Sequence, residues 1–102
     1  KLRIISNPKE AVKGADVIIT DTWVSMGMNQ SLNRLKKFKN FQINSKLVNK
    51  TEKDSFILHC LPAHRGEEIT NDIIDGKNSL VWDEAENRLY THQSILIWCL
   101  DL

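Results

Sequence analysis

Two short apolar runs, "ADVIITD" at residues 15–21 and "SFILHC" at residues 55–60, constrain the fold of this chain most strongly. Both runs are continuous rather than alternating, which is typical of strands in a parallel sheet that is covered on both faces. Two further apolar segments, "KLRIIS" at 1–6 and "SLVW" at 79–82, predict additional strands, and "FQIN" at 41–44 predicts a short one.

Helical segments separate these predicted strands. In "NPKEAVKG", Asn7 can cap a helix, Pro8 suits its first position, Glu10 can complete a capping box and Gly14 can end it. Further helices are predicted at 29–38, around 46–48, at 71–76 and from 84 onward. Because strands alternate with helices, the sequence predicts an α/β fold with an open, mostly parallel sheet and helices on both faces.

The length and composition predict a single globular domain over residues 1–102. The sequence is 41% hydrophobic and 26% charged, with a formal charge of +1, which gives no reason to expect nucleic acid. No apolar run approaches the roughly 18 residues that a membrane span needs. Two cysteines without zinc-like spacing favour a reducing, cytoplasmic location. The sequence starts in a strand-like run and stops in a helical one, so we expect it to be part of a longer protein.

Three predicted strands end in polar residues, and open parallel sheets bind ligands beyond these carboxyl ends. A carboxylate there can hold a cationic amine, and a neighbouring cysteine, with a usual pKa near ~8.5, can donate or accept a proton. Arg88 offers a planar fork of donors that suits phosphate. The sequence therefore indicates a small-molecule site. The strand-end residues are Asp21, His59, Cys60, Asp83 and Glu84.

Structural interpretations of the same residues stay open at this point. Cys60 can be a small buried apolar residue, and Asp21 can be a turn or cap residue. Arg88 can pair with Glu84 four positions earlier on one helix.

Two histidines, His59 and His64, could in principle bind a metal together with a carboxylate. Their spacing does not match a zinc motif, so we expect no metal to bind there.

Three motifs together resemble the ornithine carbamoyltransferase family. They are "DTWVSMG" at 21–27, "HCLPAHRGEEIT" at 59–70 and "VWDEAENR" at 81–88. Their order and spacing are similar to those of that family's C-terminal, ornithine-binding domain, and the similarity runs over nearly the whole chain. The resemblance implies a Rossmann-like second domain of the carbamoyltransferase fold, which would be incomplete here.

The resemblance also implies a role for each matching residue. Asp21 would bind the α-amino group of ornithine, and a loop would close over the amino acid. Cys60 would lie beside the reacting δ-amine, and Arg88 would help to hold carbamoyl phosphate. The implied ornithine-binding residues are Asp21, Ser25 and Met26. The implied carbamoyl-phosphate-binding residues are Cys60, Leu61 and Arg88, and the implied catalytic residues are Cys60, Asp21 and Arg88.

The implied reaction transfers the carbamoyl group of carbamoyl phosphate to the δ-amine of L-ornithine, giving L-citrulline and phosphate. It needs no metal and no organic cofactor. The implied partners are these two substrates and identical subunits of a homotrimer, with no nucleic acid and no membrane. Both arginine biosynthesis and the degradative direction are compatible with the motifs.

Other functions stay open beside this one. Putrescine carbamoyltransferase shares the "HCLP" stretch, although the intact "SMG" at 25–27 favours ornithine. A non-enzymatic amino-acid-binding module, a decayed paralogue or a generic α/β domain packed against a partner is also possible. The family's phosphate-gripping Ser-Thr-Arg-Thr-Arg segment does not occur here, so we expect the isolated chain to be inactive.

Overall fold

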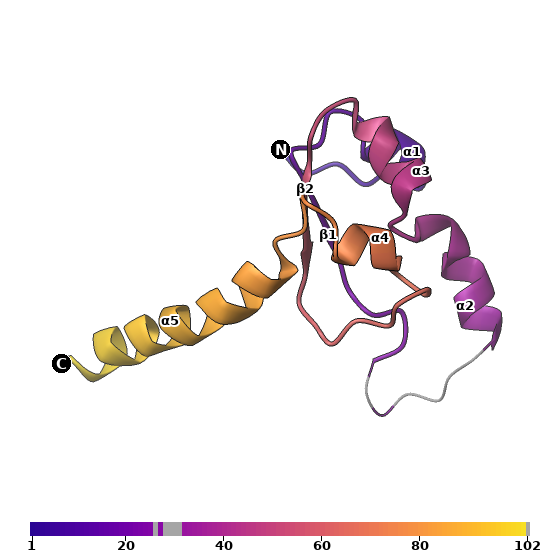
Figure 1. Ribbon diagram of the computed structural model, residues 1–102. Helices are drawn as coiled ribbons and strands as arrows, with labels where there is room; N and C mark the ends of the chain where they lie inside the picture. Colours follow the sequence, from indigo (N-terminus) through magenta and orange to yellow (C-terminus); the bar gives the residue numbers. More distant parts are fainter. Residues whose placement is uncertain (26, 28–31, 102) are drawn as a thin grey trace.

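The computed structural model describes residues 1–25, 27 and 32–101 (Figure 1). In the described residues, helices precede, separate and follow two strands. The strands are β1 (Val17–Thr20) and β2 (Phe56–His59). The α-helices are α1 (Pro8–Ala11), α2 (Leu32–Phe38), α3 (Ser45–Val48), α4 (Asn71–Ile74) and α5 (Val81–Leu100), and two 3-10 turns cover Lys39–Phe41 and Asn49–Thr51.

The two strands form a parallel sheet in which Val17 pairs with Phe56 and Thr20 pairs with His59. On the other side of β2, the Ile57 N–H donates to the Asn78 carbonyl at 3.0 Å, and the Leu80 N–H donates to the Ile57 carbonyl at 2.9 Å. The parallel α/β class predicted from the sequence is therefore confirmed.

The strand predicted at 79–82 is wrong beyond its first residue. Only Ser79 forms a bridge to β2, and α5 begins at Val81. Val81 is fully buried, and the Glu84 N–H closes the first helical turn onto the Leu80 carbonyl at 2.8 Å. Asp83 and Glu84 consequently lie in the first turn of a helix rather than at the end of a strand.

The core lies on one face of the sheet, between the strands and the short helices. Ile18 and Ile57 share this face, and Leu47 of α3 and Ile74 of α4 pack into the same cluster. On the opposite face, Val17, Ile19 and Phe56 are 44%, 68% and 49% exposed. In the described part of the chain, the two-stranded sheet thus buries one face well and leaves much of the other open. The remaining buried core residues are Val12, Ile43, Ile69 and Val81.

The predicted strand at residues 1–6 is also wrong. These residues form no strand, and Leu2 and Ile4 are 89% and 93% exposed. An apolar run forms a strand only when a neighbouring strand pairs with it, and the described residues provide none here. The strand predicted at 41–44 is reduced to a single bridge between Ile43 and Ile69.

The first helix forms as predicted. The Asn7 side chain accepts a hydrogen bond from the Lys9 N–H at 3.1 Å, and Pro8 occupies the first turn. Gly14 follows with a φ of +66°, a left-handed conformation that glycine adopts without strain. Its N–H donates to the Thr51 carbonyl at 3.1 Å, which directs the chain into β1.

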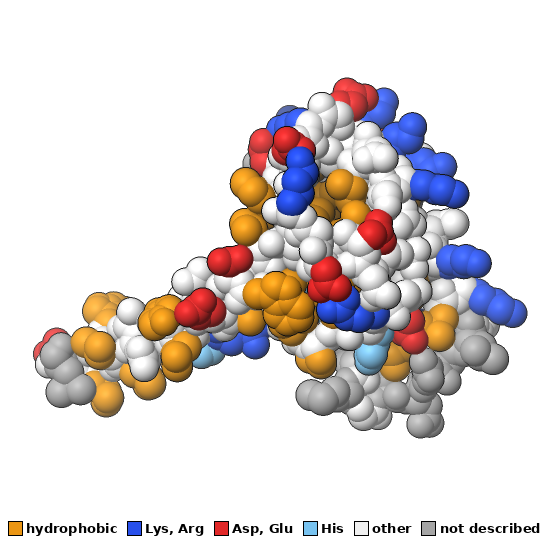
Figure 2. Space-filling model, viewed as in Figure 1, with side chains coloured by type: hydrophobic (Ala, Val, Ile, Leu, Met, Phe, Trp, Pro, Cys, Tyr) orange, Lys and Arg blue, Asp and Glu red, His pale blue; other side chains and the backbone are white. Residues whose placement is uncertain are grey.

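Helix α5 projects away from the rest of the molecule (Figure 1). Apolar side chains lie along its outer part, as the orange patches in Figure 2 show. None of the described helices is both long enough and apolar enough to span a membrane. The exposed apolar residues of this outer part are Leu89, Tyr90, Ile95, Leu96, Ile97, Trp98 and Leu100.

Candidate functional site

The strand register brings Asp21 and Cys60 together. Because Thr20 pairs with His59, the residues that follow them leave the same edge of the sheet side by side. The Cys60 thiol donates to Asp21 Oδ1 with an Sγ–O distance of 3.1 Å. The sequence-based prediction that these two residues meet at the carboxyl ends of the strands is consistent with this geometry.

This contact sets the charge of both groups. The hydrogen bond to Asp21 raises the pKa of the Cys60 thiol, and partial burial and the nearby negative charge raise it further. The same bond, helped by the Thr22 N–H that donates to Asp21 Oδ1 at 2.6 Å, lowers the pKa of the Asp21 carboxyl. At neutral pH the site therefore holds a protonated thiol beside an exposed carboxylate.

Helix α5 holds the end of β2 through two side chains that lie one turn apart. Arg88 Nη2 donates to the Cys60 carbonyl at 2.7 Å, and Glu84 Oε2 accepts from the His59 N–H at 3.0 Å. Arg88 and Glu84 thus each bind the main chain of β2, and the hydrogen bonds and ion pairs of the described residues include none between them. Arg88 has five N–H donors, and it uses one of them for Cys60.

The loop after Cys60 is built around a buried pair, His59 and Glu68. His59 Nδ1 accepts from the Leu61 N–H at 2.9 Å, so the ring proton is on Nε2, which donates to Glu68 Oε1 at 3.1 Å. Both side chains are completely buried. Glu68 Oε1 also accepts from the His64 N–H, so this carboxylate holds both ends of the turn. His59 therefore holds the loop that follows Cys60 in position.

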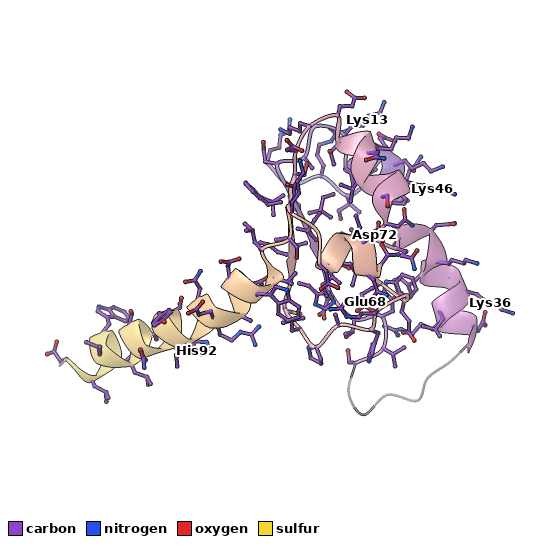
Figure 3. All side chains as sticks on the ribbon, viewed as in Figure 1. Lys13, Lys36, Lys46, Glu68, Asp72 and His92 are labelled. Carbon is purple, nitrogen blue, oxygen red and sulfur yellow. The ribbon has the colours of Figure 1, made fainter. Side chains whose placement is uncertain are left out.

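Sequence reasoning missed the roles of Glu84 and Glu68. Glu84 was expected at a strand end, and Glu68 was one of two adjacent glutamates with no distinguishing pattern. The only feature of the sequence that could have indicated the role of Glu68 was the pair of adjacent glutamates after the "HCLP" turn. Figure 3 shows Glu68 in the interior of the molecule, whereas His92 lies out on α5.

The loop that follows β1 begins at an anchored residue. Trp23 is buried, and its carbonyl accepts from Arg34 Nε at 2.6 Å. Ser25 lies beyond it and is exposed. Met26 lies outside the described residues, so the predicted role of this loop in binding ornithine stays a prediction.

A cavity of about 430 Å³ lies between β2 and α5. Leu58, Glu84, Arg88 and His92 are among the residues that line it, and Asp21 and Cys60 are not. Arg88 therefore both lines this cavity and donates to the Cys60 carbonyl, so its remaining N–H donors can bind an anion in the cavity.

Comparisons with known proteins agree with the motifs. Residues 1–99 match the family model described as aspartate/ornithine carbamoyltransferase, Asp/Orn binding domain. An ornithine carbamoyltransferase of Rhodopseudomonas palustris is 52% identical over 99 residues, which cover 97% of this chain and 32% of that protein. The chain thus spans about a third of the length of this curated relative.

Solved structures give the same result at the level of the fold. The anabolic ornithine carbamoyltransferase of Campylobacter jejuni is 41% identical, with a TM-score of 0.83 over 93% of this chain and 31% of that one. The ornithine transcarbamoylase of Giardia lamblia is 38% identical, with a TM-score of 0.84 over 94% of this chain and 30% of that one. The chain belongs to the aspartate/ornithine carbamoyltransferase family, and its residues 1–99 match that family's Asp/Orn binding domain.

Proposed function

We propose that this chain is the ornithine-binding part of an ornithine carbamoyltransferase, which transfers the carbamoyl group of carbamoyl phosphate to L-ornithine and releases L-citrulline and phosphate. One observation carries the proposal: Asp21 and Cys60 meet at adjacent strand ends while Arg88 binds the Cys60 carbonyl. This arrangement supports the proposal, because a carboxylate that can bind an amine, a thiol and a guanidinium that can bind an anion lie next to one another.

Asp21 binds the α-amino group of ornithine. Its carboxylate is exposed, and its lowered pKa keeps it negative at neutral pH. An ammonium group is a stronger partner for a carboxylate than a thiol is, so ornithine replaces Cys60 at Asp21. Ser25 and Met26 then close over the amino acid and exclude water.

Cys60 orients the δ-amine toward the carbamoyl carbon. Because its pKa is raised, the thiol is protonated when substrates arrive, so it first acts as a hydrogen-bonding group rather than as a thiolate base. The δ-amine, with a usual pKa near ~10.4, must lose a proton before it attacks. Once ornithine has displaced the thiol from Asp21, the hydrogen bond that raises the Cys60 pKa is lost. The thiol then releases its proton to solvent, and the resulting thiolate accepts the proton of the δ-ammonium group.

Arg88 and the main chain at residues 60–61 bind carbamoyl phosphate. The guanidinium stabilises the negative charge that develops on the departing phosphate. Since the Leu61 N–H is already donated to His59 Nδ1, the main-chain group that Leu61 offers is its carbonyl, which suits the amide N–H groups of the carbamoyl moiety.

The rest of the proposed enzyme lies outside this chain. In the family, a separate domain grips the phosphate and a neighbouring subunit of a homotrimer completes each site, and we extend both features to the full-length protein. Both cysteines are free thiols, which is consistent with the cytoplasmic location we propose.

Calorimetric titration of the purified chain with L-ornithine tests the first part of this proposal. We expect weak binding that Asp21→Asn reduces at least about tenfold, because the ammonium loses its carboxylate. Asp83→Asn is the matched control, since Asp83 is exposed on α5, and it should bind as the parent does. Equal affinity for Asp21→Asn and the parent would contradict the assigned site.

Two comparisons separate the alternative functions. Putrescine lacks the α-carboxylate, and binding as tight as that of ornithine would favour a putrescine carbamoyltransferase. In a citrulline assay with both substrates, we expect no product from the chain alone. Product that depends on Cys60 would show that the chain builds a working site without further domains, whereas ornithine binding that carbamoyl phosphate never affects, even with the other domain present, would favour a binding module.

A further inference from the structure

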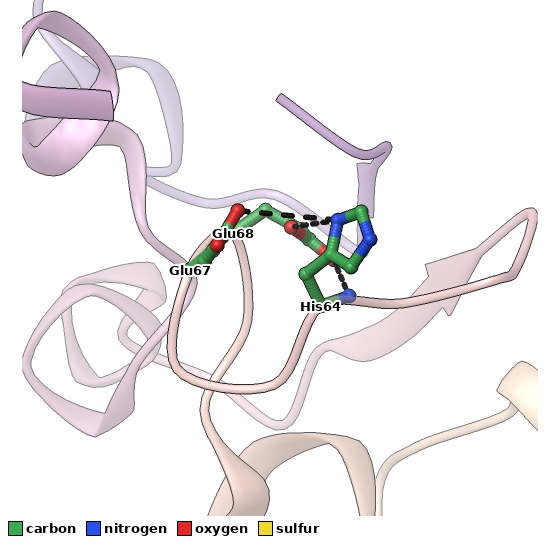
Figure 4. A group of neighbouring side chains, drawn as sticks. All are labelled: His64, Glu67 and Glu68. Carbon is green, nitrogen blue, oxygen red and sulfur yellow. Dashed lines mark hydrogen bonds and ion pairs between the residues drawn. The ribbon is translucent and has the colours of Figure 1, made fainter. Parts of the chain in front are cut away.

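Three side chains on the turn between β2 and α4 converge on a common point. His64 Nδ1 lies 3.9 Å from Glu67 Oε2 and 4.0 Å from Glu68 Oε2, and the candidate ligand atoms all lie within 4.8 Å of one another (Figure 4). The three residues are spaced i, i+3 and i+4, and the turn brings them together although they do not lie on a helix. This cluster is separate from the Asp21–Cys60 pair.

Glu68 supplies a second, independent observation. Its side chain is completely buried, and Oε1 accepts from His59 Nε2 and from the His64 N–H, whereas Oε2 accepts no hydrogen bond from the described residues. His59 is the Nε2–H tautomer and brings no charge. The neighbouring Arg65 is paired with Asp75, with Nη2 to Oδ1 at 2.9 Å. Glu68 is therefore a buried carboxylate whose Oε2 lies 4.0 Å from His64 Nδ1, and the ion pairs of the described residues include none between Glu68 and a Lys or Arg.

A buried carboxylate without a cation is unfavourable, because the interior solvates charge poorly. A positive charge would therefore be stabilised most beside Glu68 Oε2, the oxygen that accepts no hydrogen bond from the described residues. His64, which is about half exposed, forms the outer side of this position and leaves a path from solvent.

We propose that His64 Nδ1, Glu67 and Glu68 bind a divalent transition-metal ion of the Zn²⁺ class, with water in the fourth position. One imidazole and two carboxylates suit zinc, whereas Mg²⁺ and Ca²⁺ prefer sites made of oxygen ligands alone. Tetrahedral zinc with bonds of about 2.1 Å separates its ligand atoms by about 3.4 Å. The observed 3.9 and 4.0 Å would have to close by about half an ångström on metal binding, and the His64 and Glu67 side chains are partly exposed.

Metal binding at this cluster would be coupled to the loop that carries Cys60. The ion contacts Glu68, Glu68 holds His59, and His59 holds the Leu61 N–H. An ion that binds the folded chain more tightly than the unfolded one also raises the stability of the fold. This proposal departs from the expectation drawn from the sequence, which considered His64 together with His59 and did not place it with these two glutamates.

Zinc titration of the metal-stripped chain tests the proposal. Thiols also bind zinc, so the parent for this experiment carries Cys60→Ser and Cys99→Ser. We expect one Zn²⁺ per chain by calorimetry, little response to Mg²⁺, and an affinity at least about tenfold lower in His64→Ala. The matched control is His92→Ala, which removes an exposed histidine of α5 and should leave the affinity unchanged.

A second readout guards against misfolding. Zn²⁺ should raise the melting temperature of the parent and of His92→Ala but not of His64→Ala, whose circular dichroism without metal should match the parent. Glu67→Gln, which keeps the size of the side chain, should weaken zinc as well. The proposal is overturned if the parent binds no zinc, if Mg²⁺ binds as tightly as Zn²⁺, or if His64→Ala binds zinc as the parent does.

Discussion

Helix α5 has two ends in very different surroundings. Val81, its first residue, is fully buried, whereas Trp98 near its last turn is 81% exposed. Between them, Glu84 and Arg88 bind the main chain of His59 and Cys60. The difference shows that the part of the helix that carries site residues is the part fixed by the core, while the outer turns depend on local helix formation.

The largest expected effect comes from making the same Ile→Ala substitution once in the buried core and once on the exposed outer part of α5. Ile57→Ala removes buried side-chain atoms and leaves a cavity, so the free energy of unfolding should fall by about 2–5 kcal/mol. Ile97→Ala, at a 52% exposed position of α5, should change it by less than about 0.5 kcal/mol. Urea denaturation measures both, and equal losses would show that the outer helix is packed in solution.

The next prediction concerns the polar part of the buried region. His59→Phe removes a donor from Glu68 and an acceptor from the Leu61 N–H, so it should lower the free energy of unfolding by about 1–3 kcal/mol. Adding Glu68→Met removes the buried charge and should recover part of the loss. If the double variant instead loses as much as the two single variants combined, the pair is not coupled.

A third prediction tests the boundary between the buried and exposed regions, where Cys60 meets Asp21. Asp21→Asn removes the carboxylate whose hydrogen bond, and also whose negative charge, raises the Cys60 pKa, so the thiol should titrate at lower pH. In the parent, the raised Cys60 pKa stabilises the fold at pH values below the pKa of the unfolded thiol. This stabilisation is lost as pH rises through the folded pKa. In a Cys99→Ser background, thiolate absorbance against pH measures the shift, and Asp83→Asn should produce none.

The smallest expected effect lies on the surface. Lys53 pairs with Asp16, and their side chains are 40% and 87% exposed. Lys53→Met should therefore lower the free energy of unfolding by no more than about 1 kcal/mol. High salt should abolish the difference from the parent, whereas a loss that persists in salt would point to packing of the Lys53 stem.

The local sequence pattern predicted well those elements that are stabilised by neighbours within the described residues. The apolar runs of β1 and β2 pair with each other, and the Asn7 cap with Pro8 starts α1. The runs at 1–6 and 79–82 failed because an apolar strand is indistinguishable from an apolar coil or helix start until its neighbours are known. Leu2 has no partner in the described residues, and Val81 is buried as the first residue of a helix.

The site could be predicted in part for the same reason. Asp21 and Cys60 follow paired strands, so their meeting follows from the register of the sheet. The contact of Arg88 with Cys60 and the burial of Glu68 depend on how α5 and the 61–70 turn pack, which no local pattern specifies. Glu67 and Glu68 are identical in sequence terms, and only the path of the turn distinguishes them.

The two contacts one turn apart on α5 also have a mechanical consequence. Glu84 binds the N–H of the Leu58–His59 peptide and Arg88 binds the carbonyl of the Cys60–Leu61 peptide, so the helix is tied to the main chain on both sides of His59 and Cys60. A 20-residue helix is about 30 Å long, so most of α5 extends beyond the first turns that contact His59 and Cys60. A small tilt of the whole helix would therefore move the Cys60 carbonyl relative to Asp21. The orientation of the Cys60 thiol thus depends on a helix that lies mostly outside the core.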